Sequence, residues 1–397
     1  MLVTAEARVA GDASPLLAVY RQPSPVFVRA SGSMLIDDAG RGYVDFTSGI
    51  GVNALGYGDP VIAEAITRAI ESGLIHTSNL FRTEPAEQLA AELVARSFAD
   101  RAFFCNSGAE AVEGAMKFAR RWAGGEGGEG KHEIVALRGS FHGRLFGSLA
   151  VTDRTAYQAP FAPLMPGARF VPSGDAAAMR AAVSDERTAA IIVEPVQGEG
   201  GIVPFAPDYL RALRAIADEA NALLIFDEVQ CGMGRTGTLF AHEQAGVAPD
   251  ILTLAKPLAG GLPMGAVLLT DRVAATIRPG DHATTFGGGP LVSAVALAVV
   301  RRIGDAAFLA HVRELGAGLG ARLARLKDGR AVLDVRGVGM MWGIELSKPA
   351  APVVAAALDA GLLILTAGER IVRLLPPLAI DEAELDRGVT ILEEVLA

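Results

Sequence analysis

The sequence has few cysteines and no concentrated positive charge, and both absences narrow what the protein can be. Its 397 residues include two cysteines, Cys105 and Cys231, which are too few for a disulfide framework and favour a reducing compartment. The net charge is −9, and no lysine–arginine cluster alternates with aromatic residues, so we expect no nucleic-acid surface. The six histidines have no metal-ligand spacing, and we expect no metal site.

Long apolar runs are also missing, although 51% of the residues are hydrophobic and the mean hydropathy is +0.34. The longest candidates, such as residues 291–300, fall well short of the ~18 residues that a membrane-spanning helix needs. The first residues lack a basic stretch followed by an apolar one, so we expect no signal peptide and a cytoplasmic location. The apolar residues are therefore expected to fill an interior, which a chain of this length can bury without metals or disulfides.

The middle of the chain alternates short apolar runs with an amphipathic segment. Residues 189–193, 223–226 and 251–254 predict buried strands. Residues 208–220 predict a helix with Asp208 as its N-cap. Strand, helix and strand at this spacing indicate βαβ units, so the fold class is α/β with a mostly parallel central sheet flanked by helices.

Both ends of the chain follow a different pattern, which predicts a smaller α+β part. At the N-terminal end, residues 31–46 predict a hairpin that turns at 38–42. Between the two ends, the glycine-rich residues 124–130 predict an exposed flexible loop. The C-terminal part predicts helices near 291–303, 305–326 and 381–396, with short strands near 331–336, 340–346, 362–366 and 371–375.

Three of the predicted strands end on ionisable residues: Glu194, Asp227 with Glu228, and Lys256. Polar residues often follow strands for no functional reason, but in an open parallel sheet ligands bind beyond the carboxyl ends of the strands. A lysine in apolar surroundings is expected to have a lowered pKa and can act as an amine nucleophile. The sequence therefore predicts a site where these three residues meet.

A predicted helix over residues 109–122 begins with Ser107 and Glu110 at the spacing of a capping box. One interpretation is simply a well-capped helix. The other is an anion site, because free N–H groups at Gly108 and Ala109 beside the positive end of the helix dipole would hold a phosphate.

Aromatic and basic residues suggest further contacts. Phe141 is either a core residue or a ring that stacks on a flat cofactor, and His142 is expected to be structural or supporting. Arg144 either forms a surface ion pair or binds a carboxylate through two parallel hydrogen bonds. Arg373 lies within an apolar strand and needs a buried carboxylate or an anionic substrate as its partner.

Two glycine-rich segments resemble nucleotide-binding motifs, but their context excludes them. Residues 232–237 match G-x-G-x-x-G without following a strand directly, and residues 125–131 approach a P-loop but are followed by His132 instead of serine or threonine.

Taken together, these segments resemble the class III aminotransferases, which bind pyridoxal phosphate (PLP) on fold type I. The resemblance runs from about Tyr20 to the C-terminus and is closest to the acetylornithine-type members. The segments that carry it, in this order, are residues 49–56, 76–80, 106–111, 141–144, 194–201, 227–230, 232–237, 254–256 and 284–288.

The resemblance implies roles for individual residues. Lys256 would hold the cofactor and move the proton between the substrate Cα and the cofactor C4′, and Asp227 would pair with the ring nitrogen. The other implied cofactor contacts are Ser107, Gly108 and Ala109 at the phosphate, Phe141 and Val229 on the two ring faces, Gln230 at the ring hydroxyl, Glu194 in support, and Thr285 from a neighbouring subunit. The implied substrate contacts are Arg144 and Thr284 for N-acetylornithine, and Arg373, masked by Glu199, for 2-oxoglutarate or glutamate.

The resemblance also implies an activity and an assembly. The expected reaction converts N-acetylornithine and 2-oxoglutarate into N-acetylglutamate semialdehyde and glutamate, in a homodimer with shared sites. Related donors stay open: succinylornithine, ornithine, 4-aminobutyrate and a carrier-linked lysine. A non-catalytic, PLP-free protein on the same fold is the alternative from a different class. The expected domains are a large one over 59–289 and a small one built from 1–58 and 290–397.

Three residues depart from the family's usual pattern. Gly289 replaces an asparagine, Pro257 follows the lysine where a small residue is typical, and Tyr57 stands where histidine is common. Pro257 affects the loop after the lysine and Tyr57 the substrate entrance, so these departures bear on substrate choice more than on the cofactor.

Overall fold

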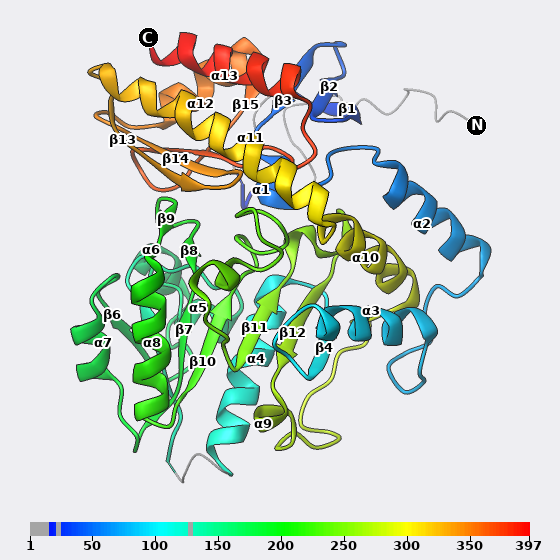
Figure 1. The fold of residues 1–397 in the computed structure, drawn as a ribbon, viewed down its shortest axis with the longest axis vertical. Helices are drawn as coiled ribbons and strands as arrows, with labels where there is room; N and C mark the ends of the chain where they lie inside the picture. The colour runs from blue at the N-terminus through cyan, green and yellow to red at the C-terminus, as the bar shows by residue number, and fades with distance from the viewer. Residues whose placement is uncertain (1–15, 21–24, 126–129) are drawn as a thin grey trace.

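The computed structural model describes residues 16–20, 25–125 and 130–397, so the centre of the predicted loop at 124–130 lies outside the described residues. A seven-stranded sheet forms the middle of the molecule (Figure 1), in the order β4-β12-β11-β10-β7-β5-β6. Its strands are β4 (Arg101–Cys105), β5 (Glu133–Leu137), β6 (Ala168–Val171), β7 (Thr188–Val193), β10 (Leu223–Asp227), β11 (Ile251–Leu254) and β12 (Gly265–Leu269).

The central sheet is mostly parallel, as the sequence predicts. β10 pairs in parallel with β7 and β11, and β5 pairs in parallel with β6 and β7. β11 and β4 are both antiparallel to β12, so β12 alone runs against the rest of this sheet. Every residue of β7, β10, β11 and β12 is buried, which explains why these strands read as unbroken apolar runs.

Helices cover both faces of this sheet and form two apolar cores. Leu224 and Phe226 point into the core that includes α8 (Pro207–Glu219), while Leu223 and Ile225 point into the core that includes α4 (Gly108–Ala123). This alternation follows from the two-residue period of a strand. The remaining helices of this region are α5 (Phe146–Ala150), α6 (Thr155–Gln158), α7 (Ala176–Ala182), α9 (Asp271–Ala274), η1 (Ala159–Phe161), η2 (Ala241–Ala245) and η3 (Lys256–Ala259).

The predicted N-cap of α8 is wrong. The cap is Ala206, which makes no side-chain hydrogen bond, and Asp208 lies in the first turn. Pro207 takes the first helical position, where its fixed φ and missing N–H are tolerated, so the helix begins before Asp208.

The two ends of the chain meet in a four-stranded sheet of order β1-β2-β3-β15. Its strands are β1 (Phe27–Ser31), β2 (Met34–Asp37), β3 (Gly42–Asp45) and β15 (Leu362–Leu363). The predicted hairpin is confirmed as the antiparallel pair β2–β3, while β15 joins β3 in parallel from the far end of the chain.

A second four-stranded sheet, of order β13-β14-β17-β16, lies above the central sheet in Figure 1. It consists of β13 (Val332–Val338), β14 (Met341–Leu346), β16 (Leu365–Thr366) and β17 (Ile371–Leu374), and a two-stranded hairpin of β8 (Val196–Gln197) and β9 (Val203–Pro204) lies below it. The strand predicted at 362–366 is in fact β15 and β16, which belong to different sheets, with Ile364 between them.

The other helices belong to the N-terminal and C-terminal parts of the chain. They are α1 (Ser48–Gly51), α2 (Pro60–Glu71), α3 (Glu84–Ala95), α10 (Pro290–Ile303), α11 (Ala306–Ala324), α12 (Ala351–Ala360), α13 (Glu382–Leu396) and η4 (Arg325–Asp328). The predicted helices at 291–303, 305–326 and 381–396 are confirmed as α10, α11 and α13. Although α10 begins just after the expected domain boundary, it packs against α2, α3 and η3. The boundaries themselves stay a prediction.

Among the described residues, no helix combines the length and apolar character that would carry it across a membrane.

Candidate active site

The three ionisable strand ends meet at one cavity of about 430 Å³. Glu194 follows β7, Asp227 ends β10 and Lys256 follows β11, and neighbouring parallel strands bring these ends to one edge of the sheet. The other predicted site residues that line this cavity are Ser107, Gly108, Ala109, Phe141, Arg144, Glu199, Val229 and Gln230.

Lys256 occupies a strained position at the start of η3. Its φ is +35°, a left-handed value that is uncommon for a residue with a side chain, and Pro257 follows it. Burial, together with the positive charge of Arg373, lowers the pKa of the Lys256 amine to about 8, even though nearby carboxylates act in the opposite direction. A much larger fraction of this amine is therefore neutral at neutral pH than for an ordinary lysine.

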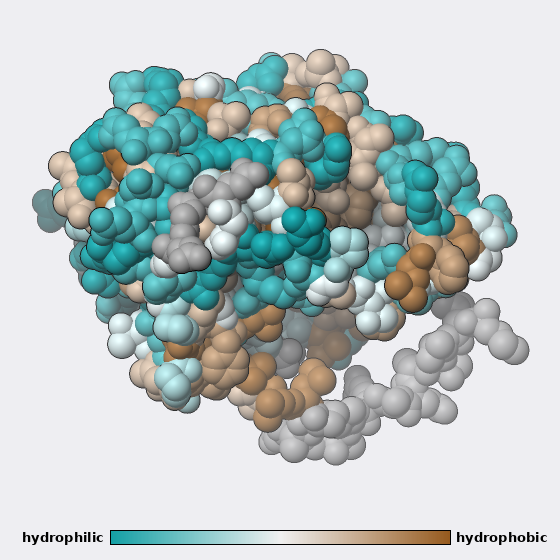
Figure 2. All heavy atoms as spheres, turned by 90° about the horizontal axis from the view of Figure 1, so that it is seen from below, coloured by the Kyte–Doolittle hydropathy of each residue, from teal (hydrophilic) through white to brown (hydrophobic). Residues whose placement is uncertain are grey.

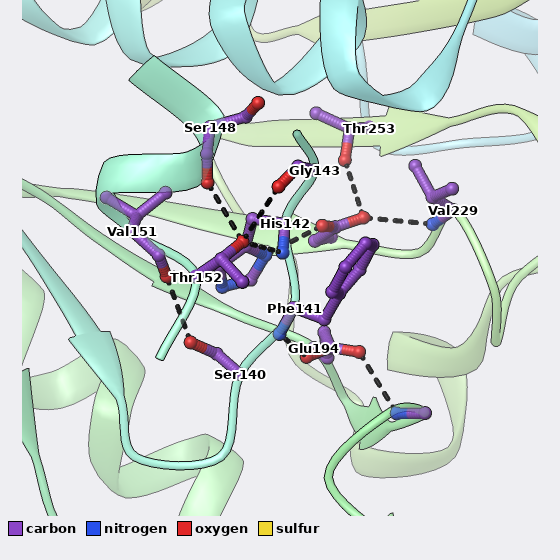
Figure 3. Close-up of polar contacts among 12 residues, drawn as sticks. Ser140, Phe141, His142, Gly143, Ser148, Val151, Thr152, Glu194, Val229 and Thr253 are labelled. Carbon is purple, nitrogen blue, oxygen red and sulfur yellow. Dashed lines mark hydrogen bonds and ion pairs between the residues drawn. The ribbon is translucent and has the colours of Figure 1, made fainter. Parts of the chain in front are cut away.

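Asp227 is fixed by three hydrogen bonds, drawn as dashed lines in Figure 3. Its Oδ2 lies 2.7 Å from His142 Nδ1, and its Oδ1 accepts from Thr253 Oγ1 and from the Val229 N–H, both at 3.1 Å. Because a carboxylate only accepts, His142 Nδ1 carries the hydrogen, while the buried Nε2 has no partner among the described residues. His142 is thus a supporting residue, as the sequence predicts, and it orients the Asp227 carboxylate.

Glu194 joins two loops at the base of the cavity. Its carboxylate accepts from the Phe141 N–H at 2.9 Å and from the Gly198 N–H at 3.0 Å (Figure 3). Burial, supported by the charge of Asp227, raises the pKa of Glu194 to about 7. The loop that carries Phe141 and the loop that carries Glu199 are therefore held by the same side chain.

The N-terminus of α4 has free donors that face the cavity. Ser107 Oγ accepts from the Glu110 N–H at 3.2 Å. The Glu110 carboxylate accepts from the Asn106 N–H at 2.7 Å, whereas a capping box would have it accept from the N–H of Ser107. The N–H groups of Gly108 and Ala109 have no acceptor in the described part of the chain, as is usual at a helix start. A Cβ on Gly108 would lie 2.7 Å from Val229 Cγ1, so only glycine fits there without moving Val229.

Arg144 stands exposed at the cavity wall, with its guanidinium over an aromatic ring. The guanidinium carbon lies 3.4 Å from the ring centroid of Tyr157 and 5.7 Å from that of Phe141. No carboxylate lies within ion-pair distance of Arg144 among the described residues, so its charge is available to a ligand. Tyr157 was missed in the sequence, because nothing in its neighbourhood distinguishes it from a surface tyrosine.

Arg373 is buried in β17 and pairs with Glu199, the partner that the resemblance implies. Its Nη1 forms an ion pair with Glu199 and lies 3.5 Å from Gln230 Oε1, while Nε has no partner among the described residues. Arg373 is absent from the cavity wall, where Glu199 stands in front of it. Removing the Glu199 side chain from Arg373 would expose a buried cation to the cavity.

Besides Arg373, two of the predicted contacts lie outside this cavity. Thr284 Oγ1 accepts from Asn106 Nδ2 at 3.1 Å and so contacts the loop before α4 without reaching the cavity wall. Thr285 is exposed and does not line the cavity of its own chain. Asn106 and Thr253 were missed as contacts, because their roles depend on residues far away in the sequence.

These residues fit pyridoxal phosphate, the cofactor that the resemblance implies. A flat, anionic molecule with an aldehyde and a basic ring nitrogen needs an amine, a buried carboxylate and a set of anion donors. The cavity offers Lys256, Asp227 and the free N–H groups at the start of α4, and Phe141 and Val229 also line it.

The comparisons with known proteins agree with this chemistry. Residues 18–396 match the family described as aminotransferase class-III. The chain is 48% identical over 386 residues to the mitochondrial acetylornithine aminotransferase of Alnus glutinosa, covering 96% of this chain and 85% of that protein.

Solved structures that superpose on this chain include two aminotransferases. The N-acetylornithine aminotransferase of Stenotrophomonas maltophilia K279a superposes with a TM-score of 0.82 at 38% identity, over 94% of this chain and 96% of that one. The ornithine aminotransferase of Toxoplasma gondii ME49 superposes with a TM-score of 0.92 at 30% identity, over 96% and 92%.

Proposed function

Because this chain belongs to the class III aminotransferases, we propose that it transfers the δ-amino group of N2-acetyl-L-ornithine to 2-oxoglutarate. The products are N-acetyl-L-glutamate 5-semialdehyde and L-glutamate, as in arginine biosynthesis, and the cofactor is pyridoxal 5′-phosphate. The observation that carries the proposal is one cavity with a lysine of lowered pKa, an Arg144 at its wall that no carboxylate of the described residues pairs with, and an Arg373 that Glu199 masks.

When bound, the cofactor supplies a conjugated ring that takes up the electron pair left when a proton leaves the amino-bearing carbon. Asp227, held by His142, would pair with the ring nitrogen and favour its protonated form. Ser107, Gly108 and Ala109 would hold the phosphate. The remaining assignments are Phe141 and Val229 on the ring faces, Gln230 at the ring hydroxyl and Glu194 in support.

Lys256 holds the cofactor at rest and moves the proton during turnover. Lys256 would take the proton from the amino-bearing carbon of the donor, which is Cδ in N-acetylornithine, and would return a proton to the corresponding carbon, Cα, as glutamate forms from 2-oxoglutarate. A group that both takes and gives a proton works best when its pKa lies near the working pH, and a pKa of about 8 meets that condition.

Two arginines divide the substrates. Arg144 binds the α-carboxylate of N-acetylornithine, with Thr284 nearby, and Arg373 binds the α-carboxylate of 2-oxoglutarate or glutamate. Glu199 covers Arg373 while the donor is bound and moves away for the acceptor, so the α-carboxylate of the donor meets Arg144 alone and the α-carboxylate of the acceptor meets Arg373.

The active unit in this proposal is a homodimer that shares its sites. Phe286, beside Thr285, is 67% exposed, and Leu80 and Phe81 are 88% and 71% exposed. In the view from below, apolar residues gather along one edge of a largely hydrophilic face (Figure 2). Large apolar side chains left in water mark a contact surface, and a second copy would bring Thr285 to the phosphate of the first.

The proposed reaction is tested by following the nitrogen. N-acetylornithine labelled with ¹⁵N at the δ-amine is incubated with the holoenzyme and unlabelled 2-oxoglutarate, and the products are observed by NMR. We expect the label in glutamate and none left on the semialdehyde. Unlabelled glutamate, or no glutamate at all, would refute the proposed function.

Ornithine is the second candidate donor, since an ornithine aminotransferase superposes with a TM-score of 0.92. Its α-ammonium group would approach the guanidinium of Arg144, whereas an N-acetyl group is neutral there. We therefore expect ornithine to react more slowly than N-acetylornithine.

A further inference from the structure

The Glu199–Arg373 pair leaves a question about where the carboxylate goes when Arg373 is uncovered. Glu199 lies in the turn between β8 and β9, at the cavity wall. Once it leaves Arg373, its carboxylate is a charge in a partly buried place and needs a new partner.

Arg154, just before α6, is bonded to the same residue. Its Nη2 donates to the backbone carbonyl of Glu199 at 2.7 Å, and its Nη1 donates to the carbonyl of Asp153 at 3.0 Å. Among the described residues, no carboxylate lies within ion-pair distance of Arg154, so this partly buried cation keeps its charge and several N–H donors uncommitted.

The backbone on either side of Glu199 is also held. The Gly198 N–H donates to Glu194 at 3.0 Å, and Arg336 Nε donates to the Gly201 carbonyl at 2.9 Å. With the backbone fixed, uncovering Arg373 requires only a rotation of the Glu199 side chain. That rotation takes place beside the guanidinium that already binds the Glu199 carbonyl.

We propose that Arg154 is a positioning residue for Glu199, which fixes its backbone and receives its carboxylate when Arg373 is uncovered. This inference rests on the proposed function only in that Arg373 binds a carboxylate of 2-oxoglutarate or glutamate. Arg154 then sets the balance between the covered and uncovered states of Arg373. If the uncovered state is less populated, the apparent affinity for the acceptor falls, because only molecules with Arg373 uncovered bind it.

The test uses glutarate, an unreactive dicarboxylate, titrated into the holoenzyme by calorimetry. R154Q should bind glutarate about tenfold more weakly than the wild type, as expected for the loss of one charge-assisted contact. R154K keeps the charge and should recover most of this loss. The matched control is R211Q, since Arg211 also donates to a backbone carbonyl, that of Ala245 at 2.8 Å, away from the cavity, and it should match the wild type.

Half-reaction kinetics and a crystal structure complete the test. R154Q should raise the KM for 2-oxoglutarate about tenfold, consistent with the glutarate result, and leave the N-acetylornithine half-reaction within about twofold. A glutarate complex should have the Glu199 carboxylate against the Arg154 guanidinium.

Equal glutarate affinity in R154Q and the wild type, an equal loss in both half-reactions, or a Glu199 carboxylate bound elsewhere would overturn the inference. A wild type that does not bind glutarate would do so too. Failure of the proposed donor is a separate outcome, since it would be seen with N-acetylornithine while the glutarate result still stood.

Discussion

At the scale of the residue, the lowered pKa of Lys256 predicts how the apoenzyme takes up its cofactor. Only the neutral amine attacks an aldehyde, and a pKa of about 8 means that half of the amines are neutral at that pH. The rate of covalent pyridoxal phosphate binding, followed by absorbance, should rise through pH 7 and level off slightly above pH 8. An ordinary lysine would continue to gain rate toward pH ~10.4.

A substitution of Arg373 tests the electrostatic cause of this pH profile. Its positive charge contributes to the lowered pKa, so R373Q should raise the pKa of Lys256 and move the midpoint of the profile to higher pH. A profile that still rises at pH 10 in the wild type, or an unchanged midpoint in R373Q, would contradict the electrostatic account.

The site residues could be predicted from the sequence to different degrees, for physical reasons. Glu194, Asp227 and Lys256 stand where apolar strands end, and a parallel sheet brings such ends together. Tyr157 and Arg154 act through contacts with residues that the fold alone brings near them. No local pattern of charge or hydrophobicity marks such residues.

At the scale of the element, the start of α4 tests the phosphate site. In G108A the new Cβ would lie 2.7 Å from Val229 Cγ1, so Val229, which lines the cavity, or the start of α4 would have to shift. We expect weaker cofactor binding by about tenfold or more, measured by equilibrium titration of the apoenzyme, since a packing clash of this kind is worth roughly 1–3 kcal/mol.

Gly318 in α11 is the matched control, because a Cβ there meets nothing within 4 Å and the residue is exposed. G318A should leave cofactor affinity unchanged and stabilise the helix by about 0.5–1 kcal/mol. Wild-type cofactor affinity in G108A would argue against the predicted position of the phosphate.

The elements most easily predicted were those with a strong period or an unbroken apolar run. The buried strands β7, β10 and β11 and the helices α4 and α11 belong to this group. Helix α12 was missed because its segment is almost wholly apolar and has no polar face to set a helical period. The break at Ile364 could not be predicted, since it depends on two sheets that compete for neighbouring residues.

At the scale of the whole molecule, one buried arginine joins distant parts of the chain. Arg235 has no exposed surface, and it donates to the carbonyls of Met340, at 3.0 Å, and Pro376, and to Ser48 Oγ at 3.4 Å. R235M should lower the free energy of unfolding by about 2–4 kcal/mol, because it leaves buried acceptors unpaired. Urea denaturation of the holoenzyme measures this.

The comparison variant is R211Q, whose exposed side chain should change stability by less than about 0.5 kcal/mol. If R235M and R211Q unfolded at the same urea concentration, Arg235 would have no part in joining the central sheet to the C-terminal strands.

The proposed shared site predicts complementation between two inactive variants. K256A lacks the amine, and T285E places a negative charge where the partner's phosphate would lie. A heterodimer of the two retains one site with both wild-type residues, so co-expressed and separately tagged chains should regain about half of the wild-type activity per dimer. A heterodimer as inactive as either parent would contradict a shared site.

The apolar content of the sequence has its explanation at this scale. Much of it fills the two cores on either face of the central sheet, and large exposed residues remain for a partner. Pairing of β3 with β15 brings the two chain ends together, as expected from the resemblance, but no local pattern predicted this strand pair. Net charge said nothing about the ligands, since in this account an acidic chain binds the carboxylates of both substrates through particular arginines.

The central claim, that N-acetylornithine is the amino donor, is tested most directly by a comparison of half-reactions. The pyridoxal form of the enzyme is mixed in turn with N-acetylornithine, succinylornithine, ornithine and 4-aminobutyrate, and the rate of chromophore loss is measured by stopped-flow absorbance. The account predicts that N-acetylornithine reacts with the highest kcat/KM and that R144A lowers this value far more than it affects 2-oxoglutarate. A faster reaction with ornithine or 4-aminobutyrate, or no loss of chromophore with N-acetylornithine, would contradict it.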